Sequence, residues 1–265
     1  MSVEQPLYDR PAFLEAYLEF PRSKLGLDGA SEWPTLRAIV GNLESQTGVD
    51  LGCGLGWFVQ YAIEAVASFV DGFDISSKMI EGAKEKTPSR CRPKLTTRLQ
   101  ISILYSAPTV DSQFCWGRVE LEKYTYDLAY SSLALHYIPT DSLRRLLKEI
   151  HASLKPGGRF VFSIEHPIFT APSKAEFETL PDSRKVWPLD NYVEEGLRET
   201  NWLGTEGVRK FHCTIQTYLQ SLLEIGFVIR DLVEWMPSKE DLLKYPDWKG
   251  ALERPMFLLV KVVKA

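Results

Sequence analysis

The sequence predicts an α/β protein built on a mostly parallel sheet. Short apolar runs alternate with amphipathic, helix-like stretches along the chain, and a glycine-rich turn joins one apolar run to the next helical stretch. The composition agrees, because the 265 residues are 45% hydrophobic and 25% charged, as in an ordinary globular protein. A chain of this length can form one α/β domain, so we expect a single domain over residues 1–265.

The elements follow from the pattern of apolar residues. Strands are expected at Thr47–Leu51, Phe69–Ile75, Tyr126–Ser131, Arg159–Ile164, Phe227–Glu234 and Phe257–Val263. Helical spacing between them predicts helices at Trp57–Ala67, Ser77–Lys86, Thr140–Leu154 and Thr214–Ile225. Gly226 ends the last helix, and the run Lys155–Gly158 ends the helix before it and turns the chain into the next strand.

Three stretches do not follow this alternation of strands and helices. Residues 1–45 predict one or two amphipathic helices, which we interpret as an N-terminal helical lid. Residues 88–118 are rich in Pro and Arg, with one short β-like run at Leu99–Leu104. Residues 166–212 are long and rich in aromatic residues, so we expect a substrate-side insertion, a long loop of the kind that often acts as a lid.

Charge and apolar run length exclude several classes of protein. The net charge of −4 offers no broad basic surface for nucleic acid. Apolar runs such as Met256–Val260 are far shorter than a membrane span, and the N-terminus lacks the pattern of a secretion signal. The four cysteines form no CxxC pair, and no His, Cys, Asp or Glu cluster has metal-ligand spacing. We therefore expect a cytoplasmic protein that binds no nucleic acid, membrane or metal.

The most informative run is Asp50-Leu-Gly-Cys-Gly-Leu-Gly56, between a strand and a helix. Its three glycines permit a ligand to approach the backbone, and the helix beyond them offers free N–H groups. The Gly-x-Gly-x-Gly spacing differs from the Gly-x-Gly-x-x-Gly of dinucleotide sites, and Asp50 would repel phosphate but attract an ammonium group. Asp74, at the end of the next strand, can accept both hydroxyls of a ribose. A tight turn without a ligand is the alternative, which the two acids disfavour.

With these residues the sequence resembles the class I S-adenosylmethionine-dependent methyltransferases. The matching blocks occur in the family's order over residues 47–165: Asp50–Gly56, Gly72–Met79, Tyr126–His136 and Leu154–Phe160. The chain is most similar to the small-molecule "methyltransferase domain" group. The resemblance implies a Rossmann-like, doubly wound, seven-stranded sheet that is parallel except for a reversed last strand. It also implies S-adenosyl-L-methionine as the cofactor and S-adenosyl-L-homocysteine as the product.

The resemblance also implies which residues bind the cofactor. Asp50 and the glycine backbone would hold the methionine moiety, Asp74 the ribose hydroxyls, Ile75 and Met79 the adenine ring, and Glu120 the adenine amino group. Residues of the N-terminal helices would close over the cofactor. The implied set is Tyr17, Arg22, Asp50, Gly52, Cys53, Gly54, Gly56, Asp74, Ile75, Met79, Glu120, Leu121 and Ser131. The stretch between Lys86 and Glu120 is longer than the family usually needs, so Glu120 depends most on where the third strand lies.

Methyl transfer from a sulfonium is an in-line displacement, so the protein must align the acceptor, exclude water and accept a proton where one is lost. Two histidines follow the fourth and fifth expected strands, where open α/β sheets bind ligands: His136 and His166. Either is a candidate catalytic base, and either can instead be a hydrogen-bonded structural residue. Glu165 and His166 alternate across the strand end, so we expect only one of them to face the pocket.

The first hypothesis for function is methyl transfer to an oxygen, nitrogen or sulfur atom of a small-molecule substrate, by a monomer or homodimer. The run Tyr130–Leu133 differs from the Asn/Asp-Pro-Pro-Tyr run of nucleic-acid amino methylases. One alternative is a cofactor-binding protein of this fold with a non-methylating role, as an isomerase, a cyclase or a regulatory binding protein. A nicotinamide dehydrogenase is a second alternative, which the glycine spacing disfavours. Further candidates for the substrate wall, or else for the core, are Trp187, Tyr192, Trp202, His212 and Tyr218.

Overall fold

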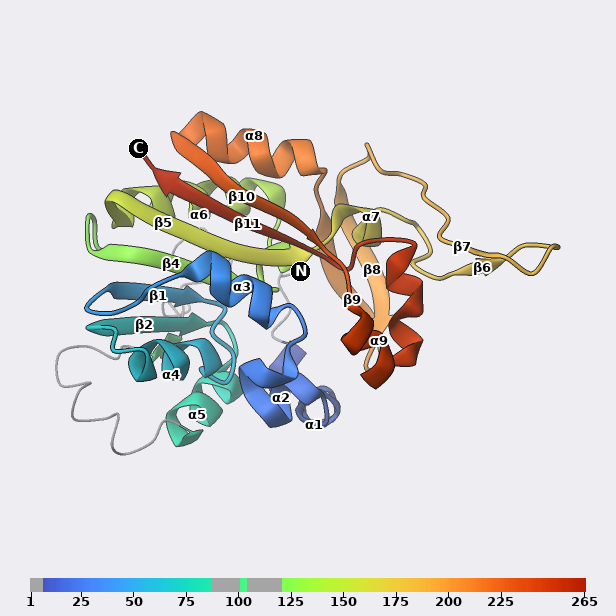
Figure 1. Ribbon diagram of the computed structural model, residues 1–265, viewed down its shortest axis with the longest axis horizontal. Helices are drawn as coiled ribbons and strands as arrows, with labels where there is room; N and C mark the ends of the chain where they lie inside the picture. The colour runs from blue at the N-terminus through green and yellow to red at the C-terminus, as the bar shows by residue number, and fades with distance from the viewer. Residues whose placement is uncertain (1–6, 87–100, 104–120) are drawn as a thin grey trace, which may run out of the picture.

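The computed structural model describes residues 7–86, 101–103 and 121–265, which form a central sheet with helices on both faces (Figure 1). Within this part of the chain the sheet has seven strands, in the order β10-β11-β5-β4-β1-β2-β3. They are β1 (Thr47–Leu51), β2 (Phe69–Asp74), β3 (Ile101–Ile103), β4 (Tyr126–Ser132), β5 (Leu154–Glu165), β10 (Phe227–Trp235) and β11 (Phe257–Lys264). The α-helices are α1 (Pro11–Leu18), α2 (Pro21–Leu25), α3 (Trp33–Val40), α4 (Trp57–Glu64), α5 (Ser77–Lys86), α6 (Thr140–Ser153), α7 (Pro167–Thr170), α8 (Ile215–Ile225) and α9 (Lys239–Lys244).

Strand directions confirm the predicted doubly wound fold. The strands β3, β2, β1, β4 and β5 run parallel to one another, and β11 runs antiparallel to both β5 and β10. The reversed strand is the last in the chain, as expected. Since β1 lies between β2 and β4, the connections leave it in opposite directions, and open α/β sheets bind ligands at the carboxyl ends of the strands at such a point.

Alternation along the strands produces two cores, one on each face of the sheet. Ala129, Phe160 and Phe162 pack with α6 and α8 on one face, and Leu128 and Val161 pack with α3, α4 and α5 on the other. Side chains of neighbouring strand residues point to opposite faces, so each central strand contributes to both cores. This two-sided burial explains why the central strands are nearly continuous apolar runs in the sequence.

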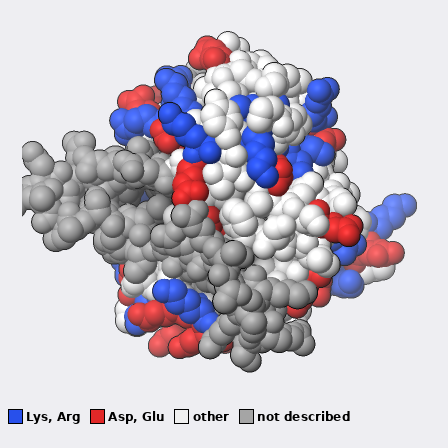
Figure 2. Space-filling view, turned by 90° about the vertical axis from the view of Figure 1, so that its left-hand side faces the viewer, with Lys and Arg blue, Asp and Glu red and all other residues white. Residues whose placement is uncertain are grey.

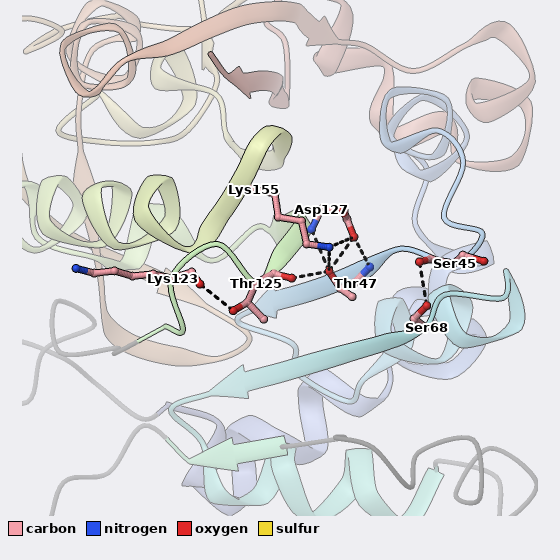
Figure 3. Close-up of polar contacts among 7 residues, drawn as sticks. All are labelled: Ser45, Thr47, Ser68, Lys123, Thr125, Asp127 and Lys155. Atoms are coloured by element: carbon pink, nitrogen blue, oxygen red, sulfur yellow. Dashed lines mark hydrogen bonds and ion pairs between the residues drawn. The ribbon is translucent and has the colours of Figure 1, made fainter.

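A polar network joins the strands at the edge of the sheet where the parallel strands begin (Figure 3). The Asp127 carboxylate accepts hydrogen bonds from the Thr47 backbone N–H and hydroxyl, both at 2.8 Å, and from Lys155 Nζ at 2.9 Å. These residues come from β1, β4 and β5. The face at this edge carries basic and acidic side chains close together (Figure 2).

Two of the stretches outside the expected alternation have a secondary structure that differs from the prediction. The described part of this N-terminal stretch, residues 7–45, holds three α-helices where one or two were expected. Residues 166–212 are not a long loop, because they contain α7, the short strands β6 (Glu178–Thr179) and β7 (Lys185–Val186), and an antiparallel hairpin of β8 (Gly196–Trp202) and β9 (Thr205–His212). The run Lys155–Gly158 lies within β5, where the pairing with β4 shifts register.

The helices of the described residues are short relative to a bilayer. None of them is both long and apolar enough to cross a membrane.

Three residues considered in the sequence analysis lie outside the described residues: Cys91, Cys115 and the predicted site residue Glu120.

Candidate functional site

A cavity of about 390 Å³ lies at the carboxyl ends of β1, β2, β4 and β5. The first helices of the chain and the tip of the β8–β9 hairpin border it on the side away from the sheet. Its lining includes Tyr8, Tyr17, Phe20, Arg22, Glu32, Gly52, Gly54, Asp74, Ile75, Met79, Ser132, Leu133, His136, Tyr137, Glu165, Phe169, Trp202, Trp248, Met256 and Phe257. Seven members of the expected cofactor set are in this lining: Tyr17, Arg22, Gly52, Gly54, Asp74, Ile75 and Met79.

The glycine turn after β1 faces the cavity with its backbone. Gly54 has a φ of +53°, and no atom lies within 4 Å of the position that a Cβ would take there. A side chain at this position would therefore be strained, and it would have free space in front of it. Gly56 has a different reason to be glycine, because a Cβ there would lie 3.1 Å from the Cβ of Ala83 on α5. The turn thus combines an open cradle with close helix packing.

Asp74 ends β2 beside this turn. Its Oδ2 accepts the backbone N–H of Gly54 at 2.9 Å, and its Oδ1 accepts that of Ser76, also at 2.9 Å. Burial raises the pKa of Asp74 to about 6, although both N–H groups favour the charged form. Asp50, at the end of β1, is buried behind the turn and is not in the cavity lining. Burial, with the negative charge of Asp74, raises the pKa of Asp50 well above its usual range.

The N-terminal segment is fastened to the same region by polar contacts. The Asp9 carboxylate accepts the Ser76 hydroxyl at 2.7 Å and the Lys78 backbone N–H at 3.2 Å, at the first turn of α5. A carboxylate is favoured at a helix N-terminus, where backbone N–H groups are unpaired. Arg22 forms an ion pair with the buried Glu32 and donates to the Ser132 hydroxyl at 3.3 Å. Arg22 therefore contributes a fixed positive charge to the lining.

The end of the cavity beyond β4 and β5 contains a carboxylate and a histidine. Glu165 ends β5, and both of its carboxylate oxygens accept hydrogen bonds from Lys210 Nζ on β9, at 2.6 and 2.8 Å. His136 Nδ1 accepts the backbone N–H of Glu165 at 3.4 Å. Burial lowers the pKa of His136 to about 4, so its ring is neutral at neutral pH. Because Nδ1 is an acceptor, the neutral ring carries its proton on Nε2.

His166 lies outside the cavity lining. Its ring is buried, with Nδ1 accepting the Ile168 backbone N–H at 3.1 Å and Nε2 3.0 Å from Glu234 Oε1. Of the two alternating residues at this strand end, Glu165 faces the cavity. The catalytic role expected of His166 remains a prediction, and this placement does not support it.

Other expected residues lie next to the cavity but not in its lining. Ser131 Oγ donates to the Leu51 carbonyl at 2.7 Å, and the following residue, Ser132, lines the cavity instead. Cys53, Gly56 and Leu121 are also outside the lining. Among the candidates for the substrate wall, Trp202 lines the cavity, whereas the others do not: Trp187, Tyr192, His212 and Tyr218. Within the described ranges, no group of three or more His, Cys, Asp or Glu side chains is arranged to hold a metal ion.

Sequence reasoning missed several residues of the lining, and it missed Lys210, which contacts the lining residue Glu165. Glu32 and Lys210 are buried charges on elements far from the glycine turn in the sequence, and only their partners explain them. Tyr137 follows His136 directly, so the strand-end rule that selected His136 could have selected it as well. Trp248 and Met256 come from the segment between α9 and β11 and carry no local signal.

Comparison with known proteins shows the family. Residues 49–162 match the family described as "Methyltransferase domain". The crystal structure of an S-adenosylmethionine-dependent methyltransferase from Mesorhizobium loti is 40% identical in sequence, with a TM-score of 0.78, and the match covers 90% of this chain and 100% of that one. The chain belongs to the S-adenosylmethionine-dependent methyltransferases. A methyltransferase of this class takes S-adenosylmethionine as its cofactor, so the expected family, class I fold and cofactor are confirmed.

Two further relatives extend over nearly the whole methyltransferase. A structure from Listeria monocytogenes, assigned to the same class of enzymes, is 36% identical with a TM-score of 0.74 and covers 91% of this chain and 99% of its own. A Haemophilus influenzae protein of unassigned function is 32% identical over 270 residues, which is 100% of this chain and 99% of its own length. The likeness therefore includes the N-terminal helices and the β8–β9 hairpin as well as the central sheet.

Proposed function

We propose that this methyltransferase acts on a small molecule, which it methylates at an oxygen, nitrogen or sulfur atom inside the cavity. The observation that carries the proposal is the division of the cavity into two ends. One end is formed by the glycine turn and Asp74, and the other by Glu165, His136 and aromatic side chains. When bound, S-adenosylmethionine supplies an activated methyl group on a positively charged sulfur.

The residues of the first end fit this cofactor. Gly54 leaves free space where a side chain would stand, and the Asp74 carboxylate is already oriented by two backbone N–H groups. A carboxylate held in this way can accept both ribose hydroxyls in a bidentate contact. Ile75 and Met79 follow Asp74 in the lining and would pack against adenine. The ribose and adenine contacts are therefore proposed for these three side chains.

The methionine moiety of the cofactor carries a carboxylate and an ammonium group. We assign the carboxylate to Arg22, whose guanidinium reaches the cavity from α2. Tyr17 on α1 lies in the same part of the lining, and the glycine turn offers backbone groups to the ammonium. Asp50 lies buried behind that turn and outside the cavity lining, so no direct contact with the ammonium group is assigned to it.

The border of the cavity supports a small acceptor. Trp202, at the end of β8, packs edge-on against Phe13 with ring centroids 5.5 Å apart, and its ring lies 6.3 Å from that of Phe20. These contacts join the N-terminal helices to the β8–β9 hairpin beside the cavity. We propose that both segments exclude water during methyl transfer, which favours a small molecule over a nucleic acid or protein substrate.

The proposal is tested by binding and transfer measured separately. Isothermal titration calorimetry with S-adenosylmethionine and S-adenosylhomocysteine should show binding of both. A screen with S-adenosylmethionine radiolabelled in its methyl group, over pools of small metabolites, should then show label in a small product. Label found only in protein or nucleic acid would contradict the small-molecule proposal. Binding without transfer to any pool would favour a non-methylating role.

A further inference from the structure

We infer that the acceptor is a neutral compound with a hydroxyl or amine on an aromatic or apolar skeleton, and that it is bound through Glu165. Lys210, on the β8–β9 hairpin, is the residue that positions this carboxylate. The inference rests on the proposed function and names the substrate class of the same cavity.

The contact between Glu165 and Lys210 is bidentate and buried. Lys210 Nζ lies 2.6 and 2.8 Å from the two carboxylate oxygens, and the Lys210 side chain is only 6% exposed. The Glu165 side chain is 16% exposed and lies in the cavity lining. A carboxylate has about four lone-pair positions, so two remain for a donor in the cavity. Lys210 thus fixes the rotamer of Glu165 without saturating it.

Charges around Glu165 favour a neutral partner. Lys210 from β9 balances its charge, and the Arg254 guanidinium, just before β11, adds a further positive charge nearby. His136 is neutral, and the charge of this carboxylate contributes to the raised pKa values of Tyr137 and Tyr218, so both tyrosines are neutral as well. Burial raises the pKa of Glu165, but the lowering effects of its neighbours, Lys210 first among them, together outweigh burial and the net shift is downward. These cations would repel an ammonium group, and the ionised Glu165 would repel an anion.

Aromatic rings surround this polar pair. Phe169 and Trp202 both line the cavity, and their ring centroids lie 5.7 and 5.5 Å from Lys210 Nζ. Trp248 and Phe257 extend the apolar wall. Aromatic walls of this kind favour a flat or apolar skeleton, with a polar handle where a hydrogen-bond partner exists. A phenol, an apolar alcohol or an aromatic amine combines both properties.

The assigned step balances in atoms and charge. A lone pair of the acceptor oxygen or nitrogen forms the new bond to the methyl carbon, and the electron pair of the broken carbon–sulfur bond stays on sulfur. The hydrogen of the acceptor hydroxyl or amine, already donated to Glu165, passes to that carboxylate as the new bond forms. His136 offers its Nε2–H as a donor beside this contact, which orients the acceptor.

Equilibrium binding tests the substrate class without a known reaction. Protein with and without S-adenosylhomocysteine is titrated by calorimetry with a panel of phenols, apolar alcohols, aromatic amines, alkylammonium ions and carboxylates. We expect the neutral donors to bind best. Glu165→Gln should lower their affinity about tenfold or more, because a hydrogen bond to a charged group is lost. Glu234→Gln is the matched control, since that carboxylate contacts His166 outside the cavity lining. Best binding by ions, no binding by any neutral donor, or unchanged affinity in Glu165→Gln would overturn the inference.

The positioning role of Lys210 is tested by the pH dependence of the same binding. In Lys210→Met the pKa of Glu165 should rise. As the pH is lowered, this variant should therefore lose affinity for the neutral donors at a higher pH than the wild type does. Lys210→Arg should restore the wild-type profile. Arg209→Met is the control on the neighbouring position of β9, where Arg209 pairs with Glu199. Because an unpaired buried carboxylate is destabilising, the double variant Lys210→Met/Glu165→Gln is included, and its affinity should not depend on pH. Equal profiles for wild type and Lys210→Met would overturn the role. Failure of S-adenosylhomocysteine to bind would count against the proposed function alone, because the panel is also titrated without it.

Discussion

The backbone N–H of Gly54 donates to the carboxylate of Asp74 at 2.9 Å, across 20 positions of the sequence. This bond joins the end of β1 to the end of β2, at the point where the connections of the sheet diverge. It aims an acid at the cavity that the glycine turn leaves open.

Replacing the acid should weaken cofactor binding while leaving the fold in place. Asp74→Asn keeps the size of the side chain but removes the charge that would accept the ribose hydroxyls, so we expect the affinity for S-adenosylmethionine to fall about tenfold or more. Calorimetric titration measures this. Asp127→Asn, at the opposite edge of the sheet (Figure 3), should retain wild-type affinity. Equal affinities in wild type and Asp74→Asn would refute the assigned role.

Cofactor affinity should depend on pH through the same group. Burial raises the pKa of Asp74 from 3.8 to about 6, so below pH 6 the free protein must lose a proton before the ionised carboxylate can bind the ribose. We expect the affinity to fall about tenfold for each pH unit below 6, and binding at pH 5 to release a proton. The raised pKa also means that the stability of the cofactor-free protein decreases as pH rises from about 4 to about 6. Titrations in buffers of different ionisation enthalpy measure the released proton, and Asp74→Asn should abolish it.

Alanine substitutions at two glycines should distinguish the effect of backbone strain from the effect of a side chain that blocks the cavity. Gly54 and Gly157 both have positive φ, +53° and +75°, and neither has an atom within 4 Å of its Cβ position. Alanine at either site should cost about 1–2 kcal/mol of stability, measured by denaturant unfolding, because of left-handed backbone strain. Only Gly54→Ala should also lose affinity for S-adenosylmethionine, since only Gly54 lines the cavity. Similar affinities for both variants would show that the turn does not contact the cofactor.

The two histidines should respond differently to alanine. His136 lines the cavity, so His136→Ala should lower turnover about tenfold or more, with unchanged affinity for S-adenosylmethionine. His166 bonds within the fold, so His166→Ala should lower the free energy of unfolding by about 1–3 kcal/mol and keep turnover per folded molecule. The reverse result, a fully folded but inactive His166→Ala, would restore the expectation drawn from the sequence.

The central fold was predictable because its signals are local. The strands at Thr47 and Phe69 begin and end within a residue of expectation, since a buried parallel strand is a short apolar run bounded by turn residues. The glycine turn and Asp74 were predictable for the same reason, as each lies directly at a strand end.

The acceptor end was less predictable because its contacts join distant segments. Whether Glu165 or His166 faces the cavity depends on the pairing of β5 with β11 and on a lysine 45 positions away. The β8–β9 hairpin was missed because Lys210 and His212 are buried, which hides the alternation of apolar and polar residues. The two-residue turn Leu203–Gly204, with positive φ at both positions, was the signal that could have revealed it.

The anchoring of Asp9 on α5 has a practical consequence for work with this enzyme. The first described residues of the chain form part of the wall beside Met79, so a bulky affinity tag fused close to them would compete for the same space. Ala265 follows β11 at the opposite side of the sheet, where β11 pairs with Arg159 (Figure 1). Purification handles and immobilisation to a sensor chip are therefore better placed at that terminus.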